Sequence, residues 1–293
     1  FSFISPQDTV IRVRVGQTRP IFSESPVVTF PVMVVTDGDT IYVHAENITT
    51  ATVTISNGNT RATLPYRAKD LTYTLPASQF PIRAGETYTL TVTDGQRTAQ
   101  ASCTIPATQV PITSYTLDTT ITSSFGLRDT SLTLTYFWKD PAGQENYYRI
   151  RAFELYEYSV VTVNASQLFI VEKRRQQQFY FSWSRTSGRS VYQSDTNLDG
   201  AEFSSPTGDK RVENELVFQE LIRNPVKPEK GPVLLGVYLQ LLHTDRNYFL
   251  YHRSLQQTRG DNPFTEPALV YTNVRNGLGV FAGYNQYTKV VTP

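Results

Sequence analysis

The sequence predicts a mainly β protein, with an N-terminal immunoglobulin-like or fibronectin-like β-sandwich over residues 1–108 and a larger, aromatic-rich β domain over residues 109–293. The composition favours strands, because aromatic residues make up 12% of the chain and charged residues only 18%. Thr, Val and Tyr also gather in short runs that Pro, Gly, Asn and Asp interrupt. A chain of 293 residues is long enough for two domains that each bury a core.

Short strands follow one another along the first hundred residues, with turns at intervals of roughly 8–12 residues, as in a β-sandwich. The pairs Asp37-Gly38 and Asn57-Gly58 each favour a tight reversal between two strands. Tyr88 lies in a run, residues 82–90, that resembles the tyrosine corner of such domains, where the hydroxyl bonds to nearby backbone. The strands that we expect cover residues 9–15, 27–35, 40–45, 52–56, 60–66, 72–75, 87–93 and 98–105.

The boundary between the two domains is expected near Pro106 and Pro111, because proline cannot donate a hydrogen bond to a sheet. Beyond it, longer strands are predicted at residues 131–138, 147–158 and 178–184. Thr244 is a good N-cap for a helix that ends near Thr258, with Asp245 favourably placed against the helix dipole. Residues 213–222 fit a second, weaker helix, and a strand is the alternative interpretation of this segment.

The charge balance argues against a nucleic-acid-binding protein. There are 27 basic and 26 acidic residues, which gives a formal charge of +1, whereas binding to a phosphate backbone needs a concentrated basic face. A single cysteine, Cys103, excludes an intramolecular disulfide and a cysteine-based metal cluster. No apolar run reaches the 18 residues of a membrane-spanning helix.

Catalytic signatures do not stand out in the sequence. His44, His243 and His252 are the three histidines, and none belongs to a zinc-binding helix motif, a nucleophile elbow or a phosphate loop. Paired carboxylates for glycoside hydrolysis are set by spacing in three dimensions, so the sequence leaves them open. We therefore expect a protein that binds rather than catalyses.

One local motif suggests a metal site. Residues 195–200, Asp-Thr-Asn-Leu-Asp-Gly, reproduce the first half of a calcium-binding loop, with oxygen ligands at alternate positions and a glycine at the sharp turn. The candidate calcium ligands are Asp195, Asn197, Asp199 and Glu202. The twelfth loop position is Pro206 in place of the bidentate glutamate of an EF-hand, so an Asx-rich surface turn is the alternative.

The two tryptophans, Trp138 and Trp183, are the candidate ligand-binding residues. An exposed indole ring can stack on a sugar. Both residues lie in strands of alternating pattern, where a core position is the other interpretation.

Two stretches of the sequence carry a resemblance to a known family. These are the glycine-rich run Asn276-Gly277-Leu278-Gly279-Val280-Phe281-Ala282-Gly283-Tyr284 and the block Asp140-Pro141-Ala142-Gly143-Gln144-Glu145-Asn146-Tyr147-Tyr148-Arg149. With them the chain resembles, over nearly its whole length, a family of Bacteroidetes surface lipoproteins known as domain of unknown function 4249 (DUF4249). The resemblance implies attachment to the outer membrane at the cell surface, through a signal peptide and a lipidated cysteine upstream of Phe1 that this chain does not contain.

The same resemblance implies a partner. Family members are commonly encoded beside SusC-like, TonB-dependent transporters, so we expect a non-catalytic accessory protein of such a barrel that helps to capture a peptide or a glycan. Two alternatives remain open at this point. One is a free-standing glycan-binding or adhesion module, and the other is a structural subunit of a larger outer-membrane assembly.

Overall fold

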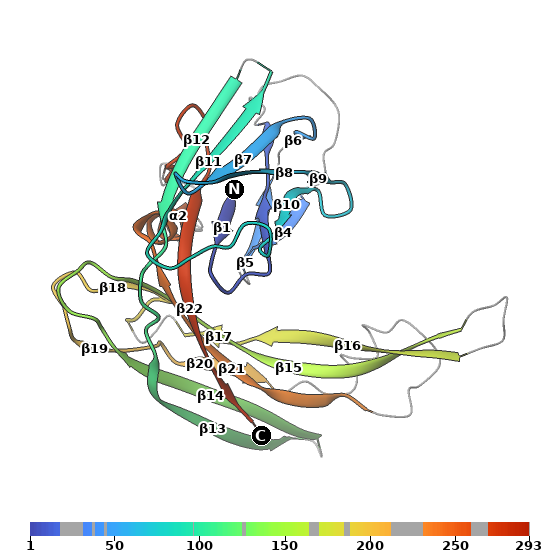
Figure 1. Cartoon of the computed structure of the whole chain (residues 1–293). Coiled ribbons are helices and arrows are strands. Elements are labelled where there is room, and N and C mark those ends of the chain that lie inside the picture. The colour runs from blue at the N-terminus through green and yellow to red at the C-terminus, as the bar shows by residue number, and fades with distance from the viewer. Residues whose placement is uncertain are drawn as a thin grey trace. The chain divides into compact units, whose positions relative to one another are not determined.

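The structure is a computed structural model, and it confirms the prediction of a mainly β protein (Figure 1). It describes residues 1–17, 32–36, 39–43, 46–95, 97–124, 127–163, 170–184, 188–211, 231–258 and 269–292. The one helix in these ranges is α2, Arg246–Thr258. The weaker helix candidate at residues 213–222 lies outside the described residues.

The chain forms two compact units. The first unit comprises Phe1–Gln109 together with His243–Gln286, and the second comprises Val110–Leu242 with Tyr287–Pro293. The domain boundary that the sequence analysis places between residues 108 and 109 stays a prediction.

The first unit contains two antiparallel sheets with a shared core, which is the arrangement of a β-sandwich. One sheet has the order β2-β10-β9 and the other the order β12-β11-β7-β8. Buried residues of both sheets, such as Ile11, Tyr73, Val53 and Leu90, belong to one apolar cluster. The strands are β2 (Val10–Val13), β7 (Thr52–Ser56), β8 (Arg61–Leu64), β9 (Tyr66–Arg67), β10 (Thr72–Pro76), β11 (Thr87–Asp94) and β12 (Arg97–Thr104).

Local turn signals position several of these strands as the sequence predicts. β7 and β8 pair on either side of Asn57-Gly58, with Ser56 opposite Arg61. The Asn57 side chain accepts hydrogen bonds from the backbone N of Asn59 and Thr60, at 3.3 and 2.9 Å. Two shorter pairs are β4 (Val32–Thr36) with β5 (Asp39–Val43) and β3 (Gly16–Gln17) with β6 (Glu46–Asn47).

The tyrosine corner is confirmed. The Tyr88 ring is fully buried, and its hydroxyl accepts a hydrogen bond from the backbone N of Arg83 at 2.7 Å. The same hydroxyl donates to Glu86 Oε2 at 2.9 Å. Burial, and secondarily the Glu86 carboxylate, raise the pKa of Tyr88 to about 12, against the lowering effect of the hydrogen bond from Arg83 N, so the hydroxyl remains a donor at neutral pH.

The late segment 243–286 supplies the helix and a strand to the first unit. The beginning of β22 (Phe281–Val291) pairs in parallel with β1 (Ser2–Ile4), with Ser2 opposite Phe281. Helix α2 is capped by Asp245 and not by Thr244 as predicted, because Asp245 Oδ1 accepts a hydrogen bond from Tyr248 N at 2.7 Å. The predicted end of this helix at Thr258 is confirmed.

The second unit also has strands on two sides of one core. The sheet of order β13-β14-β20-β17, to which β19 adds beside β14, contributes Leu134 and Tyr136. β15, with β16, β18 and β21 paired around it, contributes Tyr148 and Ile150, and β21 contributes Leu239. The strands are β13 (Ile112–Ser124), β14 (Leu127–Lys139), β15 (Tyr147–Val163), β16 (Ile170–Tyr180), β17 (Ser182–Trp183), β18 (Tyr192–Ser194), β19 (Glu202–Ser204), β20 (Gly208–Arg211) and β21 (Val233–Thr244).

Within the described ranges, no helix combines the length and the apolar character needed to cross a membrane.

Candidate functional site

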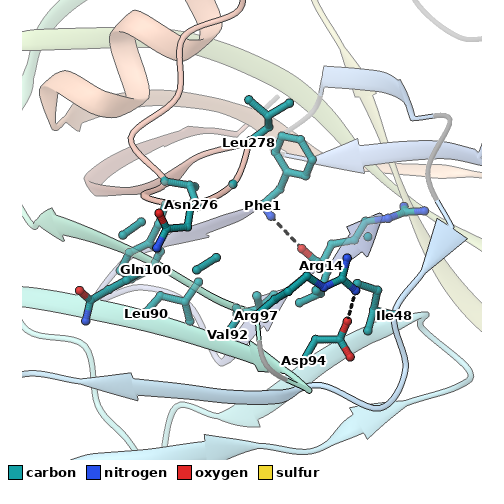
Figure 2. Close-up of a pocket in the computed structure, with 18 of the residues that line it drawn as sticks. Phe1, Arg14, Ile48, Leu90, Val92, Asp94, Arg97, Gln100, Asn276 and Leu278 are labelled. Carbon is teal, nitrogen blue, oxygen red and sulfur yellow. Dashed lines mark hydrogen bonds and ion pairs between the residues drawn. The ribbon is translucent and has the colours of Figure 1, made fainter. Parts of the chain in front are cut away.

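A pocket in the first unit is the candidate binding site, with a cavity volume of about 410 Å³ (Figure 2). Its walls come from the end of β2, from β11 and β12, and from the segment 274–281 that leads into β22. Most of the lining is apolar, and its members include Val13, Ile48, Leu90, Val92, Ala101, Val280 and Phe281. This size and character fall within the range of pockets that bind small ligands.

The glycine-rich run 276–284 helps to build this pocket, because the loop before it is bound to the edge of β12. Asn273 Oδ1 accepts a hydrogen bond from Phe281 N at 3.0 Å, and Asn273 Nδ2 donates to Phe281 O at 2.7 Å and to Ser102 O at 3.1 Å. The backbone groups of Gln100 and Arg275 exchange two hydrogen bonds, at 3.2 and 2.8 Å. The loop therefore closes the edge of the sheet.

Two positions of this loop have backbone angles that need a permissive residue. Asn276 has φ of 58°, in the left-handed region, and Gly279 has φ of 129°. Leu278 lies between them and stays 71% exposed, while the ring of Phe1 beside Gly279 is 39% exposed. Large apolar side chains are thus held at the mouth of the pocket, where water would normally disfavour them.

The polar groups of the pocket lie at its sides. Figure 2 shows Gln100 and Asn276 on one side, and Arg14, Arg97 and Asp94 on the other. Arg97 forms an ion pair with Asp94, so these two charges offset each other.

Arg14 has a different environment. Its Nε and Nη2 are buried and have no hydrogen-bond partner among the described residues, and no described carboxylate forms an ion pair with it. Burial lowers the pKa of the Arg14 guanidinium, which nevertheless remains positive at neutral pH. These two nitrogens have almost no accessible surface, so they are not open to a ligand in the pocket.

A second candidate site is a group of three carboxylates in the second unit. Single oxygens of Asp140, Asp195 and Asp199 all lie within 4.8 Å of one another. Asp140 is 3% exposed and Asp195 5%, whereas Asp199 is exposed. Burial, and then the charges of Asp140 and Asp199, raise the pKa of Asp195. Three oxygen ligands in this arrangement suit a hard cation such as calcium.

The same carboxylates also hold two turns together. Asp195 Oδ2 accepts a hydrogen bond from Asn146 N at 2.9 Å, and Asp199 Oδ1 accepts one from Gly143 N at 2.8 Å. Asp140 Oδ2 accepts one from Gly200 N at 2.8 Å, and Asp140 Oδ1 accepts one from the Tyr148 hydroxyl. Each carboxylate thus stabilises the backbone of these turns with or without a cation.

The structure brings together two of the four predicted calcium ligands, Asp195 and Asp199. Asn197 is exposed on the same turn with φ of 64°. Glu202 lies in β19 opposite Lys139 and is not one of the three clustered carboxylates. Asp140 was missed, and the signal that could have found it is its place at the start of the block 140–149.

The tryptophans lie in the second unit as parts of its packing. Trp138 is 0% exposed and stacks on Phe203, with ring centroids 5.7 Å apart, so no face of its indole is open to a ligand in this structure. Trp183 is half-buried and lies over Gly208, where a Cβ atom would come within 2.8 Å of the indole ring. The structure does not place the two indoles on a common exposed face.

The described histidines, His243 and His252, are buried in the first unit. His243 Nδ1 lies 2.9 Å from the backbone O of Thr108. His252 packs among aromatic rings, with centroids 5.1 Å from Phe3 and 4.4 Å from Tyr248. His44 lies outside the described residues.

Sequence reasoning did not identify the pocket in advance. Its walls join residues 13–17, 90–101 and 274–281, which are far apart along the chain. Of these stretches, only the run 276–279 stood out in the sequence, and it indicated a family resemblance and not a cavity.

Comparison with known proteins adds one finding. A search of curated proteins gives no match to this sequence. The profile of one protein family, described as a domain of unknown function (DUF4249), matches residues 2–290, which is nearly the whole chain. Because the match spans both units, including the pocket and the carboxylate group, the chain belongs to the DUF4249 family.

Proposed function

We propose that this chain is the non-catalytic, ligand-binding ectodomain of a surface lipoprotein that works with a SusC-like, TonB-dependent outer-membrane transporter. In this proposal a lipid at the N-terminus attaches the protein to the outer membrane. The protein captures a nutrient, either a peptide or a glycan, and passes it to the barrel.

The observation that carries the proposal is the pocket at the glycine-rich run. Asn276, Gly277 and Leu278 of that run line a cavity of about 410 Å³. Its apolar walls and its amide and guanidinium groups are suited to holding a ligand by contact, hydrogen bonds and charge. A run that identifies the family therefore also shapes a place for a ligand.

Membership of the DUF4249 family supports the partner, through the resemblance to lipoproteins encoded beside such transporters. A transporter accessory also needs no chemistry of its own. Its task is to hold the ligand and release it to the barrel.

The test is an affinity purification of the full-length, lipid-anchored protein from detergent-solubilised outer membranes, followed by mass spectrometry. We expect a TonB-dependent barrel in roughly equimolar amount. A lipoprotein of similar abundance, carrying the same tag, is the control for carry-over in detergent.

Recovery of the protein alone would contradict a stable complex with a transporter. Equimolar recovery of other envelope proteins in place of a barrel would favour the structural-subunit alternative. Mass spectrometry separates these outcomes in one experiment.

A further inference from the structure

We infer that the pocket of the first unit binds a large apolar side chain of a peptide, of the leucine or phenylalanine kind, so that peptides and not glycans are the ligands. This inference deepens the proposed function and rests on it for its biological meaning. Its physical basis is the part of the pocket lining that a ligand can reach.

The apolar lining has a buried part and an accessible part. Val280 and Phe281 are buried and support the wall from behind. Other apolar side chains of the lining are packed against the same core and keep part of their surface exposed. These are Val15, Ile48, Val92 and Val274, to which the exposed Phe1 and Leu278 add. A ligand that enters the cavity therefore meets apolar surface.

Contact with this surface is the main source of affinity that the pocket offers. Figure 2 shows Leu278 and Phe1 in one part of the lining and Val92 and Ile48 in another. Apolar side chains gathered around an opening mark ligand-binding grooves, because covering them removes apolar surface from water. A leucine or phenylalanine side chain supplies that cover, and it fits within a cavity of about 410 Å³.

The charged groups of the lining give no reason to expect a charged ligand. Arg97 and Asp94 form an ion pair with each other, and Nε and Nη2 of Arg14 have almost no accessible surface. The group that enters the cavity is therefore uncharged, as the aliphatic and aromatic side chains of a peptide are.

The rim of the pocket suits a peptide backbone. Gln17 and Asn276 are exposed members of the lining, and a side-chain amide can both donate to a peptide group and accept from it. Asn276 Nδ2 donates to Thr98 O at 3.3 Å, which fixes this amide at the edge of β12. A sugar would instead bring hydroxyl groups against aliphatic walls, where they lose their hydrogen bonds to water.

The experiment measures binding to the purified full chain by isothermal titration calorimetry. The probes are acetyl-Gly-Leu-Phe-Gly-amide, its alanine counterpart acetyl-Gly-Ala-Ala-Gly-amide, the neutral glycan maltoheptaose, and decanol. We expect the Leu-Phe peptide to bind at least about tenfold more tightly than the Ala-Ala peptide, because it covers more of the apolar lining. Its affinity should be nearly the same at low and at high salt, since no ion pair with the ligand is involved.

Two variants assign the binding to the pocket. Leu278→Ser removes an exposed apolar side chain of the lining and should weaken binding of the Leu-Phe peptide about threefold or more. Val92→Thr places a hydroxyl in the lining and keeps the branched shape that suits a strand, so it should weaken binding without loss of the fold. Leu198→Ser is the matched control, since Leu198 is exposed in the second unit and lies outside the lining. Circular dichroism and thermal unfolding show whether each variant is folded.

Equal binding of the two peptides, wild-type affinity in both folded pocket variants, or no binding of any probe would each overturn the inference. Tighter binding of maltoheptaose or of decanol than of the Leu-Phe peptide would also overturn it, in favour of a glycan or an alkyl chain. The purification of a barrel partner is a separate measurement. A barrel recovered with a protein that does not bind the Leu-Phe peptide would overturn the ligand class and leave the transporter role standing.

Discussion

Asp245 caps helix α2 and is also a half-buried carboxylate. Its Oδ1 accepts a hydrogen bond from Tyr248 N at 2.7 Å, and its backbone N donates to Gly283 O at 2.9 Å. Burial raises the pKa of Asp245 from 3.8 to about 7, against the lowering effect of the hydrogen bonds that its carboxylate accepts, the one from Tyr248 N first among them. The cap therefore stabilises the helix, while ionisation of the same group at neutral pH destabilises the folded state.

The pH dependence of stability should reveal this cost. Between pH 4 and 7 the folded state holds the Asp245 proton more tightly than the unfolded chain, so the contribution of this group falls as pH rises through that window. Asp245→Asn keeps an acceptor and does not titrate. Relative to this variant, the wild type should lose roughly 2–4 kcal/mol of unfolding free energy between pH 4 and 8, measured by urea denaturation.

Asp245→Ala separates the cap from the charge. It removes the acceptor and should cost about 1 kcal/mol at low pH, where the carboxyl is neutral. Parallel pH profiles for the wild type and Asp245→Asn would show that Asp245 has an ordinary pKa.

At the scale of single residues, the sequence predicts best where partners are close along the chain. The role of Tyr88 could be inferred because Arg83 and Glu86 are its near neighbours and the motif is local. The pocket gave no such signal, because its lining joins Arg14 with residues 94–97 and 274–281. Neither of the two stretches can be located next to residue 14 from sequence.

At the scale of elements, strands with clear alternation and turn residues were predicted well. Residues 52–56 form β7, and the hairpin at Asn57-Gly58 is present. The loop that precedes the glycine-rich run is attached to the edge of β12 through Asn273 and Arg275. The position of the edge itself could not be predicted, since it follows from the order of four strands.

Gly283 of β22 shows why that run contains small residues. A Cβ atom at this position would overlap Ile105 Cδ1 and lie 3.7 Å from Cys103 Sγ. Ile105 is 0% exposed and has little room to move. Gly283→Ala should therefore lower the unfolding free energy by about 1–3 kcal/mol.

A double variant provides the control for this prediction. Ile105→Val removes the Cδ1 atom that the new methyl group would meet, and alone it costs about 0.5–1.5 kcal/mol. Gly283→Ala combined with Ile105→Val should cost clearly less than the sum of the two single changes, as measured by chemical denaturation. Additive costs would mean that the overlap is relieved elsewhere.

The turns that carry Asp140, Asp195 and Asp199 give a prediction for calcium. An oxygen site of the extracellular type binds calcium with a dissociation constant of about 0.1–1 mM. Calcium at about 5 mM would then stabilise the protein by about 1–2 kcal/mol, and the melting temperature should rise by a few degrees over a sample in EGTA.

Asp199→Asn should abolish this difference, because it keeps an acceptor for Gly143 N and loses the charge. Glu145→Gln is the matched control, since Glu145 is an exposed carboxylate of the turn that follows Asp140 and lies outside the cluster. An identical melting temperature in calcium and in EGTA would favour the Asx-rich turn.

At the scale of the whole molecule, the first unit is discontinuous in sequence. Its core includes Phe281, which is fully buried, beside residues such as Ile4 and Ile105. Sequence reasoning divides a chain into consecutive stretches, so it has no means of assigning residues 243–286 to the first unit. The prediction of a β protein depends on local patterns and does not need this information.

This organisation predicts which fragments fold. Residues 1–109 alone lack Phe281, β22 and helix α2, so they should not show a cooperative thermal transition by circular dichroism. Residues 1–109 joined by a short Gly/Ser linker to residues 243–286 should fold, because His243 Nδ1 lies only 2.9 Å from Thr108 O. Equal melting temperatures for the two fragments would show that the late segment is dispensable.

The parallel pairing of β1 with β22 also has a kinetic consequence, because Ser2 pairs with Phe281 and cannot do so until Phe281 has been synthesised. At synthesis rates of about 5–20 residues per second, the chain between residues 109 and 281 takes roughly 10–30 s to appear. During that time the early strands have an incomplete core and exposed apolar surface. Contacts of such long sequence separation slow folding, so the nascent chain has a prolonged period in which chaperones can bind it and in which it can aggregate.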